Sequence, residues 1–122
     1  MKDHNRLIGR WGEQYAEAYL VDRGWIVLDR NIHTPYGELD LVVRQGDVLV
    51  FVEVKTRTTD SFGFPEIAVS PSKQVRLVQS AEAYLQSHAD LGDLSWRIDV
   101  IAIEGKPNGK LVKVEWFENA IG

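Results

Sequence analysis

The stretch "GELDLVVRQGDVLVFVEVKTR", residues 37–57, decides the fold of this 122-residue chain. Two apolar, β-rich runs, about Glu38 to Arg44 and about Val48 to Arg57, flank the turn sequence Gln45 to Asp47. Runs so closely spaced predict neighbouring antiparallel strands. The stretch therefore predicts the centre of a β-sheet, although it carries acids and a lysine among residues typical of a core.

Elements on both sides of this hairpin complete the fold. Helical spacing of apolar residues predicts one helix before it and one after it, with Ser70 as the N-cap of the second. The expected elements are the helix Asn5–Arg23, the strand Trp25–Ile32, the helix Ser70–His88 and the strands Trp96–Ile103 and Leu111–Phe117. The order αβββαββ, with a right-handed crossover through the second helix, indicates an α/β fold with a mixed central sheet flanked by helices. We expect a single domain over residues 1–122.

Composition excludes several classes of protein. The chain is 44% hydrophobic and 26% charged, as folded globular proteins are, and has no cysteine. A disulfide framework, a cysteine zinc site and a thiol nucleophile are therefore excluded, so any metal must be held by oxygen or histidine. The N-terminus lacks a signal-peptide core, and no run approaches the ~20 apolar residues of a membrane span. We expect a cytoplasmic protein that does not enter a membrane.

The acids of the hairpin form the candidate site. Because side chains alternate along a strand, Asp40 and Glu53 can face the same side, with Lys55 close by, and Glu13 can join them from the small-residue face of the first helix. Two carboxylates about 5 Å apart repel by roughly 3 kcal/mol at an effective dielectric near 20. Mg²⁺ or Mn²⁺ would remove most of this repulsion.

Such a site suits metal-assisted phosphodiester hydrolysis, in which Lys55 would orient water or neutralise developing charge. The alternative is a solvated sheet face on which Glu53 and Lys55 are ordinary cross-strand partners. Spacing alone leaves both interpretations open. Two other acids are interpreted structurally: Asp99 as a buried, hydrogen-bonded acid that holds a loop or Arg97, and Glu17 as a solvated surface acid.

Five motifs together resemble a known family. They are "WGEQYAEAYL" (11–20), "GELDLV" (37–42), "VFVEVKTR" (50–57), "FGFPEIAVSPSKQVRL" (62–77) and "RIDVIAI" (97–103). Over nearly the whole chain this pattern is similar to the YraN-like family of small, uncharacterised bacterial proteins. Asp40 followed by Glu53-Val54-Lys55 resembles the signature of the PD-(D/E)XK nuclease superfamily, with Leu39 in place of the proline in its name.

The resemblance implies a restriction-endonuclease-like core similar to archaeal Holliday-junction resolvases. It implies a Mg²⁺- or Mn²⁺-dependent endonuclease acting on DNA, including branched or single-stranded DNA. In that picture Asp40, Glu53 and the backbone carbonyl of Val54 bind the metal, Lys55 assists catalysis, and Glu13 completes the acidic cluster.

Net charge of −4 and a pI near 5.3 oppose this reading, since phosphate binding needs concentrated basic residues. The candidate nucleic-acid contacts are few: Arg57, Lys73 and Arg76. Weak DNA binding, or binding that depends on a homodimer or on a partner protein with a basic surface, would follow. The rival functions are a non-catalytic nucleic-acid-binding or adaptor module on the same fold, and a protein-interaction domain that uses the edge strand Leu111–Phe117.

Overall fold

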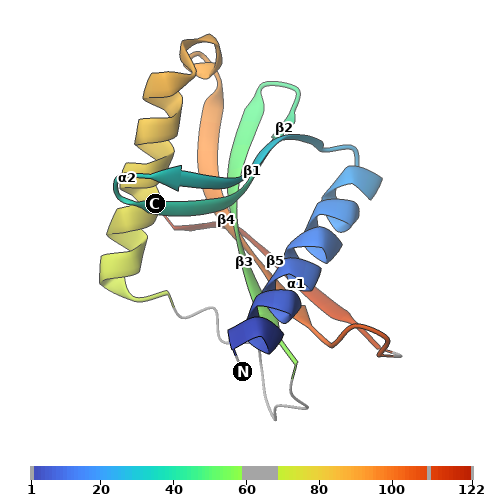
Figure 1. The fold of residues 1–122 in the computed structure, drawn as a ribbon. Coiled ribbons are helices and arrows are strands. Elements are labelled where there is room, and N and C mark those ends of the chain that lie inside the picture. Colours follow the sequence, from blue (N-terminus) through green and yellow to red (C-terminus); the bar gives the residue numbers. More distant parts are fainter. Residues whose placement is uncertain (1, 59–68, 110, 122) are drawn as a thin grey trace.

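The computed structural model describes residues 2–58, 69–109 and 111–121, with side chains from residue 6 onward. The elements follow the predicted order αβββαββ, with one added 3-10 turn, and are shown in Figure 1. They are α1 (Lys2–Asp22), β1 (Ile26–Thr34), β2 (Gly37–Gln45), β3 (Val48–Arg57), α2 (Pro71–Ser87), η1 (Ala89–Leu91), β4 (Ser95–Glu104) and β5 (Lys113–Ile121). The described helices include none that is long and apolar enough to cross a membrane.

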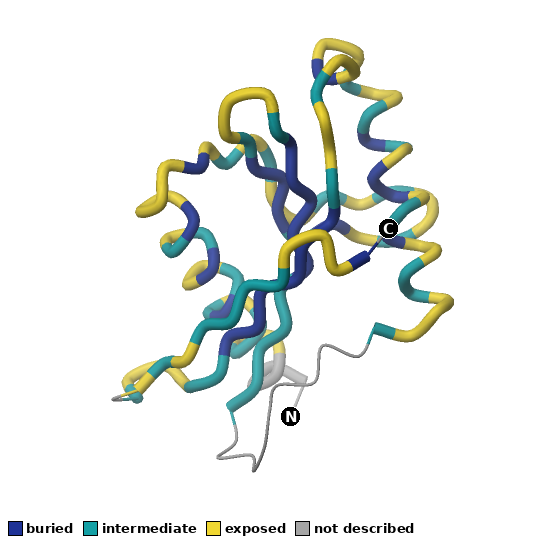
Figure 2. The backbone as a smooth tube through the Cα atoms, turned by 180° about the vertical axis from the view of Figure 1, so that it is seen from behind, coloured by how far each residue is buried: buried dark blue, intermediate teal, exposed yellow. Residues whose placement is uncertain are grey.

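The five strands form one mixed sheet in the order β1-β2-β3-β4-β5. Strands β1, β2 and β3 are antiparallel neighbours, β4 runs parallel to β3 after the α2 crossover, and β5 returns antiparallel on the far edge. The predicted α/β class, the mixed sheet and the meander of the first three strands are thereby confirmed. The central strands β3 and β4 hold most of the fully buried residues, as Figure 2 shows.

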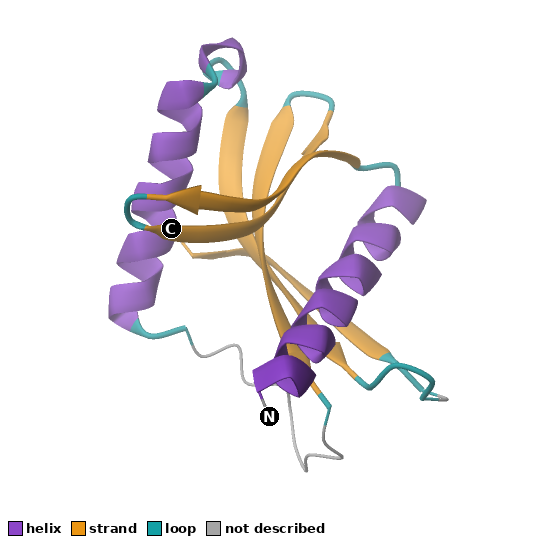
Figure 3. Cartoon of the chain, in the orientation of Figure 1, coloured by secondary structure: helices purple, strands orange, loops and turns teal. Residues whose placement is uncertain are grey.

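The two helices cover opposite faces of the sheet (Figure 3). On one face Phe51 packs in a cluster with Leu77 and Tyr84 of α2. On the other, Val50 and Val52 pack in a cluster with residues of α1. This division follows from the alternation of side chains along β3, which sends successive residues to different helices.

Helix α1 approaches β3 closely because of one glycine. A Cβ atom added at Gly12 would overlap the side chain of Thr56, whereas a Cβ at Gly9 would meet nothing within 4 Å. Gly24 follows the helix with φ of 88°, in the region that favours glycine, as expected for a residue that ends a helix. Gly12 therefore sets the distance between α1 and the sheet.

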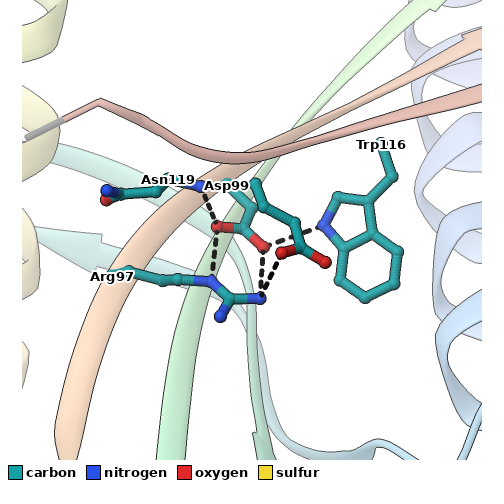
Figure 4. Close-up of polar contacts among 5 residues, drawn as sticks. Arg97, Asp99, Trp116 and Asn119 are labelled. Atoms are coloured by element: carbon teal, nitrogen blue, oxygen red, sulfur yellow. Dashed lines mark hydrogen bonds and ion pairs between the residues drawn. The ribbon is translucent and has the colours of Figure 1, made fainter.

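Asp99 ties β4 to β5 through a buried hydrogen-bond network (Figure 4). Its carboxylate, fully buried, accepts hydrogen bonds from the Arg97 guanidinium at 3.0 and 3.2 Å, from Trp116 Nε1 at 2.8 Å and from the Asn119 N–H at 2.8 Å. The pairing of the two strands shifts register between Ile98 and Val100, and Asn119 has φ of 51°. Asp99 thus holds an irregularity of the sheet, which confirms its structural interpretation.

Candidate active site

A concavity of about 290 Å³ lies between the β1–β2 hairpin and α2. Charged side chains dominate its wall: Glu38, Asp40 and Glu53 from the sheet, and Lys73 and Arg76 from α2. Four of these five were predicted site residues. The structure thus brings Asp40 and Glu53 together with two of the three predicted phosphate contacts.

Asp40 lies where β2 and β3 stop pairing. The ladder between these strands runs from Gln45↔Val48 to Leu41↔Val52. Beyond it, the Asp40 Oδ2 accepts a hydrogen bond from the Val54 N–H at 2.8 Å, so a side chain takes the place of a backbone acceptor. This hydrogen bond fixes the carboxylate in the lining of the concavity.

The environment of Asp40 disfavours its ionised form. Burial, and next the negative charge of Glu53, raise the pKa of Asp40 to about 7, although the Val54 N–H and Lys73 act in the opposite direction. Glu53 itself is only 8% exposed. Two adjoining carboxylates in this position are stabilised either by a proton or by a cation.

A hard divalent cation fits the chemistry of these donors, since carboxylate oxygens are its preferred ligands. The pair supplies two such residues. Over the described residues, however, the structure shows no group of three or more His, Cys, Asp or Glu side chains placed to hold one ion. A metal here would need to complete its shell with backbone oxygen, water or substrate.

Glu13, the third acid expected at the site, does not line the concavity of Asp40 and Glu53. Helix α1 covers the sheet face of Val52 and Val54, whereas Glu53 lies between them in sequence and therefore faces α2. Glu13 instead lines a second concavity, of about 420 Å³, between α1 and the first two strands. Its pKa is raised by burial first, next by the negative charge of Asp40 and then by that of Glu38, so Glu13 interacts electrostatically with Asp40 from a separate concavity.

Lys73 contacts the acid pair, since its Nζ lies 3.3 Å from Glu53 Oε1. Lys55 follows Glu53 on the same face of β3, as predicted, but lines a smaller concavity with Arg57 and Glu104. The predicted nucleic-acid contacts are therefore divided, with Lys73 and Arg76 in one hollow and Arg57 in another. The position of Lys73 in the first turn of α2 was the sequence signal for its role.

Two features of the region were not predicted. Glu17 is not an isolated surface acid: its carboxylate receives two hydrogen bonds from Arg30, at 2.8 and 2.9 Å, which join α1 to β1. The Thr34 hydroxyl lies 2.9 Å from Ser80 Oγ and joins the tip of the β1–β2 hairpin to α2. Ser80, a fully buried serine within the apolar stripe of α2, was the available signal for the second contact.

Comparison with known proteins gives a family and a distant structural neighbour. The profile of the uncharacterised protein family UPF0102 matches residues 12–103, a range that holds every predicted site residue. A UPF0102 protein of Syntrophus aciditrophicus is 42% identical over 121 residues, covering 97% of this chain and 94% of its own. One of Syntrophotalea carbinolica is 46% identical over 113 residues, covering 93% and 89%. The structure of Pyrococcus furiosus SfsA in complex with Ca²⁺ is similar with a TM-score of 0.42 and 14% identity, covering 97% of this chain and 65% of that one.

Proposed function

We propose that this chain, which belongs to the uncharacterised protein family UPF0102, is a metal-dependent nuclease that hydrolyses phosphodiester bonds in DNA. UPF0102 is the YraN-like family that the sequence motifs resemble, so this prediction is confirmed. The observation that carries the proposal is the acid pair of half-buried Asp40 and buried Glu53, which shares one concavity with two cations, Lys73 and Arg76.

The chain's own residues divide the work. Asp40 and Glu53 would hold a Mg²⁺ or Mn²⁺ ion, with the Val54 carbonyl as the further ligand implied by the superfamily signature. When bound, such an ion polarises a phosphoryl oxygen and lowers the pKa of its water. Lys73 and Arg76, on the α2 wall, would bind the phosphate oxygens and orient the strand.

The electrostatics of the pair support a cation in this place. Asp40 is held near the midpoint of its titration at neutral pH, because burial and Glu53 oppose its charge. A divalent cation bound by both carboxylates would offset both causes, because its charge stabilises the ionised form of each acid. Lys73 makes its 3.3 Å contact with Glu53. The spacing of Asp40, Glu53 and Lys55 and the element order αβββαββ add the resemblance to PD-(D/E)XK nucleases.

A non-catalytic nucleic-acid-binding or adaptor module is the second candidate, and the Lys73–Glu53 ion pair favours it. This pair neutralises one acid without a metal, so the same hollow could bind phosphate and cut nothing. The net charge of −4 predicts weak DNA binding in either case, strengthened by dimerisation or by a basic partner.

A metal titration separates the two candidates. Mn²⁺ should raise the melting temperature, because an ion that binds only the folded state stabilises it by about 2.7 kcal/mol at a hundred times its Kd. Asp40→Asn should abolish both this shift and Mn²⁺-dependent cleavage of labelled oligonucleotides, whereas Asp93→Asn, at an exposed aspartate, should change neither. Salt-dependent binding without a Mn²⁺ shift or cleavage would replace the nuclease with the adaptor module.

A further inference from the structure

An exposed aromatic ring stands at the edge of the candidate active site. Tyr36 belongs to the two-residue turn between β1 and β2, and its side chain is 48% exposed although it lines the concavity of Asp40 and Glu53. Figure 1 shows this turn lying against α2. A large aromatic side chain left in water beside a polar hollow offers a surface for stacking.

The turn that carries Tyr36 is held in place. The Thr34 hydroxyl accepts hydrogen bonds from the N–H groups of Tyr36 and Gly37, both at 3.1 Å, and it hydrogen-bonds with the buried Ser80 of α2 at 2.9 Å. Pro35 fixes its own φ between these residues. A ring on so restricted a backbone loses little conformational entropy when a ligand stacks on it.

The same turn lies beside the cations of the site. A Cβ atom at Gly37 would lie 3.5 Å from Ser80 Oγ and 3.9 Å from Arg76 Cβ, so the turn and α2 approach each other closely at this point. Gly37 also has φ of 153°, which side chains rarely adopt. Tyr36 is therefore fixed near Arg76, and the concavity presents an aromatic ring, guanidinium and ammonium groups and an acid pair together.

This combination matches the parts of one nucleotide. Arg76 and Lys73 suit a phosphate, the acid pair suits the hydrolysis, and the ring suits the face of a base. In a duplex the base faces are covered by their neighbours, so a base must leave the stack before a protein ring can meet it. The Tyr36 ring can therefore stack only on an unpaired base.

We propose that Tyr36 stacks on an unpaired base next to the phosphate bound by Lys73 and Arg76, and that this contact makes the site select single-stranded nucleic acid or unpaired segments over continuous duplex. The inference rests on the proposed function for the identity of the ligand. Tyr36 is a specificity-determining residue in this arrangement and takes no part in bond cleavage.

Binding tests the inference without cleavage. Fluorescence anisotropy in EDTA compares a short labelled single strand with its duplex. Tyr36→Ala should weaken single-strand binding about 5- to 150-fold, the range for loss of one base–aromatic stack, and should leave duplex binding unchanged. Tyr36→Phe keeps the ring and should bind as the original protein does. Tyr15→Ala removes an exposed tyrosine of α1 outside this concavity and serves as the matched control.

Abasic substitutions identify the base that is stacked. When one base at a time is removed from the strand, the original protein should lose affinity at one position. Removal of the same base should not weaken binding by Tyr36→Ala, because the ring and the base are the two halves of one contact. Equal binding by Tyr36→Ala and the original protein, an equal loss in Tyr15→Ala, or no binding of single strands at all would overturn the inference.

The cleavage assay keeps this inference separate from the nuclease proposal. Mn²⁺-dependent cutting whose preference for single strands survives Tyr36→Ala would overturn the stacking role and leave the nuclease intact. If the original protein cuts no strand with Mn²⁺, but removal of the stacked base still weakens its binding and not that of Tyr36→Ala, the nuclease proposal is overturned and the stacking role stands.

Discussion

Replacing Asp40 by asparagine should make the metal-free protein more stable at alkaline pH. The pKa of Asp40 is about 7 in the fold against an ordinary value of 3.8, and each unit of difference corresponds to 1.36 kcal/mol. Ionised Asp40 therefore lowers the free energy of unfolding by up to about 4 kcal/mol. Asparagine carries no charge and keeps an oxygen that can accept the Val54 N–H.

The sign follows from which state holds the proton. Below about pH 4 Asp40 is protonated in both states and costs nothing. Between about pH 4 and 7 the unfolded chain releases this proton first, so the free energy of unfolding falls as pH rises; above about pH 7 the loss is complete. Asp40→Asn should lack this part of the decline.

Urea denaturation in EDTA at a series of pH values measures the effect. Glu13, whose pKa is also raised, contributes a slope of the same sign, so the comparison is made between variants and not within one curve. Asp93→Asn, at an exposed position, controls for the loss of an ordinary carboxylate. If Asp40→Asn were no more stable than the original protein above pH 8, the ionised acid pair would not be the strained element that the site requires.

Asp99→Asn should lower the free energy of unfolding, measured by urea denaturation, by about 2–4 kcal/mol, because it leaves Arg97 facing a neutral group inside a buried network. A loss below about 1 kcal/mol would contradict this prediction. Gly12→Ala should lower the free energy of unfolding by about 1–3 kcal/mol, because the added methyl group overlaps Thr56. Gly9→Ala, at an open helix position, should leave the free energy of unfolding unchanged or raise it by up to about 1 kcal/mol. Equal changes in the two variants would show that α1 does not approach β3 as described. Lys73→Gln should lower the melting temperature in EDTA at pH 7.5, because Glu53 loses the charge of Lys73. For the same reason, adding Mn²⁺ should raise the melting temperature of this variant by more than that of the original protein. An unchanged Mn²⁺ response would contradict the role of Lys73 as a counter-ion.

The fold could be predicted because its signals are local. The turn Gln45 to Asp47, the N-cap Ser70 and the glycine after α1 each follow from backbone chemistry, and the structure has them where expected. The predicted bounds of the last strand, Leu111–Phe117, were less accurate. β5 runs over Lys113–Ile121, because it continues through the irregularity held by Asp99. That continuation depends on a hydrogen-bond network between strands, which no short stretch of sequence encodes.

The candidate site was predictable only within the hairpin. Period-two alternation was enough to bring Asp40 and Glu53 together, because both belong to adjacent strands. Placing Glu13 required knowing which sheet face α1 covers, and the contact of Lys73 with Glu53 required the position of α2. Both depend on packing between elements distant in sequence.

The hydrogen bond from the Val54 amide to Asp40 gives this half-buried carboxylate a spectroscopic reporter. An amide proton shared with a carboxylate senses whether that carboxylate is charged, so the nitrogen–proton resonance of Val54 should move as Asp40 titrates. Since the ladder between β2 and β3 ends before this point, the Val54 N–H meets the Asp40 side chain in place of a backbone acceptor of β2. Protonation in the hollow can thus be followed in solution from a single peak, with no label on substrate or metal.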